Sequence, residues 1–214
     1  FPGTIGPHRY EELLEKALSA NFNLLRCWGG CMANTDYFYH LCDSYGILVW
    51  QEFPLSCNRY GDDRHYLDVL RREATSIVRR LMGHPSILLF CGGNELFNSW
   101  SGMDDQSLAL RMLDSICYSL CPEIPFLATS PLTGMAHGNY LFRDHASGEE
   151  VFSWMRRARH TAYCEFGVSS LAPAEVLRTI IPEDELFPIR KSPSWIAHHA
   201  FGAWDDRDFT WFDE

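Results

Sequence analysis

The chain has 214 residues, of which 46% are hydrophobic, 14% aromatic and 21% charged, and this globular balance excludes a disordered tail or a collagen-like fibre. The 28 acidic residues outnumber the 18 Lys and Arg residues, which gives a net charge of −10 and argues against a nucleic-acid partner. No apolar run approaches the roughly 18 residues of a membrane span, so we expect no membrane partner.

The start of the chain indicates whether a signal peptide is present, and the cysteines indicate whether disulfides or a zinc site are expected. It begins with Phe1 and carries no basic-then-apolar signal pattern, so we expect a piece of a longer protein whose localisation stays open. The eight cysteines include no C-x-x-C pair, which disfavours a zinc site. We predict buried, unreactive thiols at five of them, with no disulfide and no metal: Cys27, Cys42, Cys91, Cys117 and Cys164.

The first half of the chain alternates between helical and strand patterns. Apolar residues at helical spacing predict helices at 7–21, 35–46 and 66–82, the second of them ending at Gly46. Short apolar runs predict buried strands at 23–28, 47–50 and 87–91.

The second half continues this alternation less regularly. Helices are predicted at 105–120, 149–159 and 173–181, and strands at 125–129 and 161–164. The stretch 135–142 is ambiguous, and residues 182–214 show no clear period.

Nearly continuous apolar strands that alternate with helices are typical of a parallel sheet covered by helices. An open doubly wound sheet and a (β/α)8 TIM barrel both fit. No glycine-rich phosphate loop follows the first strand, and polar residues gather after the strands, which favours the barrel. A full barrel needs about 250 residues. We therefore predict an α/β fold, a single truncated barrel domain over 1–214 that lacks the first and last strands.

Two carboxylates follow predicted strands: Glu95 after a Gly-Gly break and Glu165 before Phe-Gly. A pair of carboxylates across a cleft suits glycoside hydrolysis, because one donates a proton while the other attacks or activates water. Asn94 could bind a sugar hydroxyl. The structural alternative is that each Glu caps a helix or pairs with an arginine.

Long motifs in the chain resemble glycoside hydrolase family 2, in its β-mannosidase-like branch. They are NFNLLRCWGG at 21–30, FYHLCDSYGILVWQEF at 38–53, GGNE at 92–95 and CEFG at 164–167. The resemblance implies a retaining exo-β-glycosidase with Glu95 as acid/base and Glu165 as the nucleophile that forms a covalent glycosyl-enzyme. It also implies a carbohydrate substrate, no cofactor and flanking β-sandwich domains.

The chain departs from the family pattern at Gly93, where Asn is common, and at Cys164, where Ser is common. Residues 131–160 lack the W-H-G pattern of close β-mannosidases. The sugar therefore stays open between β-mannoside and the β-glucosaminide or β-galactoside of related enzymes. A hypothesis from another class is a non-catalytic, carbohydrate-binding barrel remnant.

Further residues are candidates for binding substrate. Arg26 and Trp28 have the same strand parity, so both could point into the barrel mouth, with Arg26 supporting the nucleophile and Trp28 forming the floor of the sugar site. Glu52 ends a strand, where a binding role and a salt bridge are equally possible. His137 and Tyr140 could line the site from the ambiguous segment.

Overall fold

The computed structural model describes residues 5–138, 140–144, 146–167 and 172–198. The chain divides into two compact units, residues 1–135 and 136–214, which are described separately below. The prediction of one domain over 1–214 stays a prediction. Among the described residues no helix is long and apolar enough to cross a membrane.

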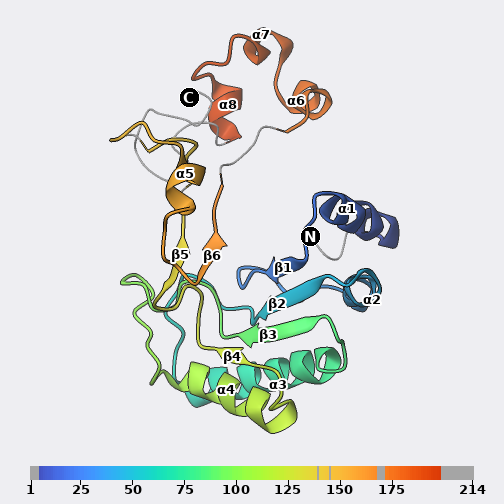
Figure 1. Cartoon of the computed structure of the whole chain (residues 1–214), viewed down its shortest axis with the longest axis vertical. Helices are drawn as coiled ribbons and strands as arrows, with labels where there is room; N and C mark the ends of the chain where they lie inside the picture. Colours follow the sequence, from blue (N-terminus) through green and yellow to red (C-terminus); the bar gives the residue numbers. More distant parts are fainter. Residues whose placement is uncertain (1–4, 139, 145, 168–171, 199–214) are drawn as a thin grey trace. The chain divides into compact units, whose positions relative to one another are not determined.

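The first unit contains four parallel strands that alternate with four helices (Figure 1). The predicted elements are confirmed, with ends that shift by a few residues. In chain order they are α1 (Pro7–Ser19), β1 (Leu24–Cys27), α2 (Asp36–Tyr45), β2 (Leu48–Glu52), α3 (Arg64–Leu81), β3 (Ile87–Cys91), α4 (Leu108–Leu120) and β4 (Phe126–Leu127).

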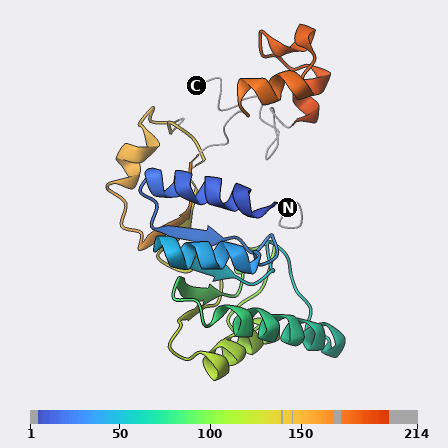
Figure 2. The same ribbon diagram turned by 90° about the vertical axis from the view of Figure 1, so that its right-hand side faces the viewer.

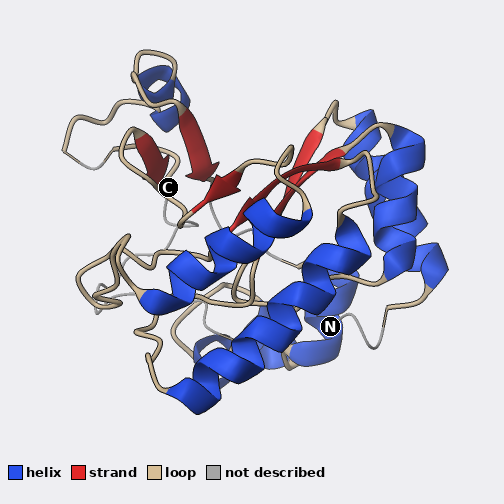
Figure 3. Ribbon diagram, turned by 90° about the horizontal axis from the view of Figure 1, so that it is seen from below, coloured by secondary structure: helices blue, strands red, loops and turns tan. Residues whose placement is uncertain are grey.

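The strand order β1-β2-β3-β4 follows the chain without reversal. Right-handed crossovers in one direction place every connecting helix on the same face of the sheet, whereas a doubly wound sheet reverses direction. Helices α3 and α4 accordingly lie side by side in Figure 1, as α1 and α2 do in Figure 2. Figure 3 shows the strands in red beside these helices in blue. The winding favours a barrel segment over the open sheet.

The two faces of the sheet differ in chemistry. Val49 is fully buried among the helices that cover one face. On the opposite face Leu24 and Leu48 pair across β1 and β2, and each is 39% exposed. Further along the same face, Arg26 pairs in register with Trp50. This face thus changes from apolar at the start of the strands to charged at their carboxyl ends.

Four of the predicted buried thiols are buried, at Cys27, Cys42, Cys91 and Cys117, whereas Cys164 is half-buried. Burial raises the pKa of Cys27, Cys42 and Cys117 to about 12 in each case, since a thiolate loses its hydration there. Cys91 pairs in register with Glu52 and so lies on the charged face. These thiols therefore act as small apolar groups.

In its described part, the second unit contains a two-stranded sheet and four short helices. The ambiguous stretch 135–142 holds the strand β5, and the predicted helix 149–159 is shortened to five residues. The elements are β5 (Met135–His137), α5 (Val151–Met155), β6 (Ala162–Glu165), α6 (Ala174–Ile180), α7 (Glu183–Leu186) and α8 (Pro193–Ala197). Residues 199–214 of the aperiodic tail lie outside the described residues.

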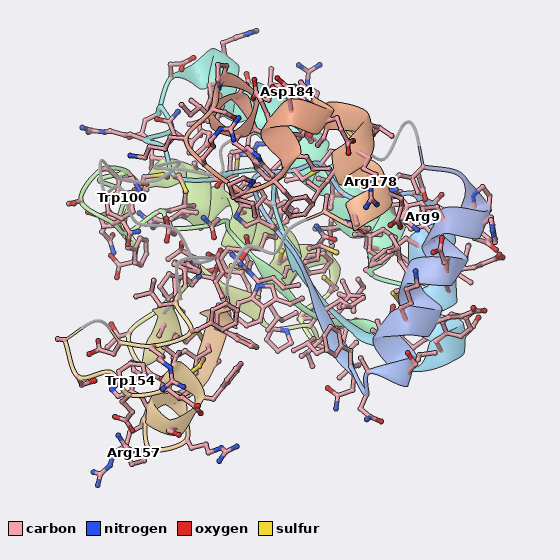
Figure 4. All side chains as sticks on the ribbon, turned by 90° about the horizontal axis from the view of Figure 1, so that it is seen from above. Arg9, Trp100, Trp154, Arg157, Arg178 and Asp184 are labelled. Atoms are coloured by element: carbon pink, nitrogen blue, oxygen red, sulfur yellow. The ribbon has the colours of Figure 1, made fainter. Side chains whose placement is uncertain are left out.

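Small clusters organise this second unit. Trp195 is 2% exposed and packs with Ile181 and Leu186. Around α5, Arg157 forms two short hydrogen bonds to Glu149, at 2.5 and 2.7 Å, near the exposed Trp154 (Figure 4). With few buried apolar residues, each cluster depends on such local contacts.

We predict that Asp63→Ala destabilises the first unit by about 1 kcal/mol, because the Asp63 carboxylate caps α3 by accepting from the backbone N–H of Tyr66 at 2.9 Å. Urea unfolding measures the change. Asp63→Asn should retain most of the stability, and Asp62→Ala, one residue outside the cap, is the matched control. Equal losses for Asp62→Ala and Asp63→Ala would contradict a capping role.

Candidate active site

A hydrogen-bonded cluster joins the carboxyl ends of the strands in the first unit. Arg26, on β1, is its centre. The Nε of Arg26 lies 2.9 Å from Oε1 of Glu52, and Nη2 donates to Oδ1 of Asn94 at 2.5 Å and to Oγ of Ser130 at 2.8 Å. Ser130 in turn donates to Oε1 of Glu52 at 2.6 Å. One guanidinium thus connects β1, β2 and the segments that follow β3 and β4.

Glu52 is a buried member of this hydrogen-bonded cluster. Its side chain is 0% exposed, and its second oxygen accepts from the backbone N–H of Gly29 at 2.7 Å. The backbone passes so close at Gly29 that a Cβ there would collide with the carbonyl oxygen of Leu55. Of the two roles open to Glu52, the structure contains the salt bridge.

Glu95 is held in an unusual backbone conformation four residues beyond β3. Its φ of 53° lies in the left-handed region, which non-glycine residues rarely adopt. Its N–H donates to the carbonyl of Ser130 at 2.7 Å, and its carbonyl accepts from the hydroxyl of Ser101 at 2.7 Å. Such strained residues cluster at functional sites. The carboxyl group, which is partly exposed, is therefore positioned by its own backbone.

Gly93 meets a steric demand two residues earlier. Its φ is 152°, and a Cβ at this position would collide with the carbonyl oxygen of Leu55. The Oγ1 of Thr129 donates to the Gly93 carbonyl at 3.0 Å and accepts from the N–H of Leu96 at the same distance. In this chain the departure from Asn at position 93 therefore has a structural reason.

Cys57 is a site residue that the sequence did not indicate. Nδ2 of Asn94 donates to its Sγ at 3.2 Å, and the thiol lies 3.4 Å from Oε2 of Glu95. Its φ of 50° is also left-handed, and its N–H donates to the carbonyl of Asn94 at 2.9 Å. No motif marks Cys57, because its partners lie 37 and 38 residues further along the chain.

The second unit positions Glu165 at the end of β6. The hydroxyl of Tyr140 donates to Oε2 of Glu165 at 2.7 Å, and Nδ1 of His137 lies 3.6 Å from the same oxygen. The His137 side chain is 6% exposed, whereas Tyr140 is 52% exposed. The sequence-predicted residues His137 and Tyr140 therefore meet at this carboxylate. The hydrogen bond from Tyr140 orients the carboxyl group, and the His137 ring lies beside the same oxygen.

The remaining predicted residue, Trp28, follows β1 and is 47% exposed. Its ring lies over Gly30, where a Cβ would overlap the indole carbons. The second glycine of the W-G-G motif therefore makes room for the indole ring. An exposed flat ring next to polar groups is the type of surface that binds sugar rings in water.

Comparison with known proteins identifies relatives of the chain, although no family model matches it. It is 36% identical to the β-mannosidase of Rattus norvegicus, over 89% of this chain and 25% of the rat protein. The β-mannosidase of Mus musculus is also 36% identical, over 86% and 24% respectively. The chain thus spans about a quarter of the length of the curated relatives it matches.

Solved structures agree with these sequence matches. The crystal structure of the β-D-mannosidase from Dictyoglomus thermophilum has a TM-score of 0.74 and 31% identity, over 85% of this chain and 24% of that one. A β-glucuronidase from Parabacteroides merdae, with a TM-score of 0.60 over 78% of this chain and 22% of that one, is 20% identical and supports the fold alone.

The sequence resemblance is therefore confirmed at the level of the family. The chain belongs to glycoside hydrolase family 2. Within that family it belongs to the β-mannosidase-like branch.

We predict that Arg26→Ala destabilises the first unit by about 3–5 kcal/mol, because it leaves the buried Glu52 without its cation. Arg26→Lys should recover part of the loss, since it restores the charge but not the planar fork. Urea unfolding checks both variants. Arg9→Ala removes an exposed ion pair with Glu12 and should change stability little, so a similar loss there would contradict the prediction.

Proposed function

We propose that this chain carries the catalytic centre of a retaining exo-β-glycosidase that hydrolyses a terminal β-linked sugar, with β-mannoside as the expected substrate. The observation that carries the proposal is the strained, hydrogen-bonded position of Glu95 in the segment that follows β3, a strand of the parallel sheet. The family membership and the second positioned carboxylate, Glu165, support it.

In the proposed first step Glu95, protonated, donates its proton to the departing glycosidic oxygen while Glu165 attacks the anomeric carbon. The glycosidic bond breaks as a covalent glycosyl-enzyme forms on Glu165. In the second step Glu95, now ionised, removes a proton from water, and the water oxygen displaces Glu165 from the anomeric carbon. The chemistry needs no metal or organic cofactor.

The neighbouring residues have supporting roles in this proposal. Cys57 and Asn94 restrict the carboxyl group and backbone of Glu95. Tyr140 and His137 orient Glu165, so that one oxygen faces the sugar. Asn94, which is 2% exposed and bonded to both Arg26 and Cys57, connects these two residues behind the site, and Trp28 offers its exposed ring as a floor. Glu52 holds Arg26 in place.

The wider architecture belongs to the same proposal. We infer that the four parallel strands are part of a TIM barrel whose inner face includes the exposed Leu24 and Leu48. Flanking β-sandwich domains would account for the rest of the relatives' length. The experiments below distinguish this proposal from two alternatives. One is a related enzyme with β-glucosaminidase or β-galactosidase specificity, and the other is a non-catalytic, sugar-binding remnant.

We predict that Glu165→Ala, in the longest protein that the gene encodes, abolishes nearly all turnover of aryl β-mannosides and leaves folding intact. The reason is that the substitution removes the carboxylate that forms the covalent intermediate in the proposed mechanism. Release of the aryl group from a panel of β-mannosides, β-glucosaminides and β-galactosides measures activity and specificity. Glu73→Ala, on the exposed face of α3, is the control. Binding of sugars without release by the unmodified protein would support the remnant.

We predict that the loss of activity caused by Glu95→Ala depends on the leaving group of the substrate. With activated aryl leaving groups the loss should be small, because these depart without a proton. With poor leaving groups the loss should reach about 100-fold or more. The slope of log kcat/KM against leaving-group pKa measures this. Equal losses across the series would remove Glu95 from the acid role.

A retaining mechanism also predicts the stereochemistry of the product. The carboxyl groups of Glu95 and Glu165 should then lie about 5–5.5 Å apart in the active protein, and the first product should keep the β-configuration. Proton NMR of the fresh hydrolysate measures the anomer before mutarotation. An α-anomer as first product would contradict retention, and so would a well-ordered carboxyl separation beyond about 10 Å.

A further inference from the structure

A second cluster of ligand-type side chains lies at the opposite edge of the sheet from Arg26. It consists of His40 and Asp43 on α2, which precede β2, and His84, which precedes β3. One ligand atom from each of the three side chains lies within 4.8 Å of the other two. Because these residues precede their strands, whereas Asn94 and Glu95 follow theirs, the cluster is separate from the candidate active site.

The local structure holds this cluster together. His40 and Asp43 are three residues apart on α2 and therefore share one face of that helix. Oδ1 of Asp43 accepts from the backbone N–H of Ser86 at 3.0 Å, and Oδ2 lies 2.6 Å from Nδ1 of His84. The rings of His40 and His84 are 5.0 Å apart between centroids. The side chains are thus assembled before any ligand arrives.

Access and burial suit a small ligand. The three residues line an open depression of about 500 Å³. The side chains of His84 and Asp43 are 10% and 20% exposed, while His40 is exposed at the rim. Burial raises the pKa of Asp43, but its hydrogen bonds from Ser86 and contact with His84 outweigh burial and leave the pKa below its usual value. The carboxylate and the two rings therefore line one depression that a small ion can enter.

We propose that His40, Asp43 and His84 form a binding site for a divalent transition-metal ion, of which zinc is the best match. Two imidazoles and one carboxylate are a common three-ligand set for zinc, with water in the fourth position. A zinc ion would bind Oδ2 of Asp43 and Nδ1 of His84 with bonds of about 2.0–2.2 Å. It would take the place of the proton that these two atoms share, and the distance between the two atoms would increase. His84 would then keep its remaining proton on Nε2.

The charged neighbours of the depression decide between a cation and an anion. Arg79 and Arg80 line it and would favour an anion, whereas Glu123 favours a cation. Arg80, however, donates to the Asn34 carbonyl at 2.8 Å and to Asp36 at 2.9 Å, so its guanidinium is engaged elsewhere. The carboxylate of Asp43, which lies among the three ligand atoms, would repel an anion. The carboxylates of Asp43 and Glu123 therefore favour a cation at the ligand atoms, with Arg79 as the charge that opposes it.

Isothermal titration of the metal-free chain with zinc chloride tests this proposal. Cys31→Ser and Cys57→Ser are introduced into every sample, so that zinc binding to these two exposed thiols does not contribute to the measured heat. We expect one zinc ion per chain. His40→Ala should weaken binding by about tenfold or more, as expected when a metal site loses a supporting group or ligand. His65→Ala, an exposed histidine on α3, is the matched control and should bind as the parent does.

Two further measurements separate binding from folding. Zinc should raise the thermal midpoint of the parent and of His65→Ala but not that of His40→Ala, since a ligand of the native state stabilises it. The visible spectrum of the Co²⁺ form should indicate nitrogen and oxygen ligands without thiolate. Absence of zinc binding, equal affinity in His40→Ala and the parent, or heat on titration with inorganic phosphate in place of zinc would each overturn the proposal.

Discussion

The buried contact between Arg26 and Glu52 is the interaction on which the first unit's carboxyl edge depends. Glu52 has no exposed side-chain surface, so its charge must be compensated inside the protein. Arg26 meets this need with one nitrogen and reaches Asn94 and Ser130 with another. A single desolvated carboxylate therefore fixes the ends of strands that lie far apart in the sequence.

The contact between Arg26 and Glu52 also positions the residues that lead to Glu95. Ser130 bonds to Arg26 through its hydroxyl and accepts the N–H of Glu95 with its carbonyl. Asn94 accepts from Arg26 and donates to Cys57, whose thiol lies against the Glu95 carboxyl group. The backbone strain at Glu95 is sustained because bonds on both sides of the residue hold it. Loss of the ion pair would therefore disturb a carboxyl group that it does not touch.

The two candidate catalytic carboxylates are supported in different ways. Glu95 depends on backbone hydrogen bonds and a thiol within a parallel sheet. Glu165 depends on a phenol and an imidazole that lie within 28 residues before it in the chain. The described contacts of Glu95 come from segments that follow three different strands, whereas those of Glu165 come from β5 and the residues just after it.

The sequence by itself determined the order and type of the elements in the first unit, because helical spacing and apolar runs record which faces are buried. It also determined the family, since the motifs around Arg26, Glu52 and Glu95 are long. Patterns were less informative in the second unit, where the helices are short and few residues are buried. There the sequence left residues 135–142 ambiguous and predicted too long a helix at 149–159.

Only the tertiary structure decided how the candidate residues are partnered. The sequence left Glu52 open between a ligand contact and a salt bridge, and burial against Arg26 decided for the salt bridge. No sequence pattern singled out Cys57, because its partners Asn94 and Glu95 are brought close by parallel strand pairing and not by local spacing. The physical reason is the same in each case: periodicity records which face of an element is buried, whereas hydrogen bonds across strands depend on register and on the path of the connecting loops.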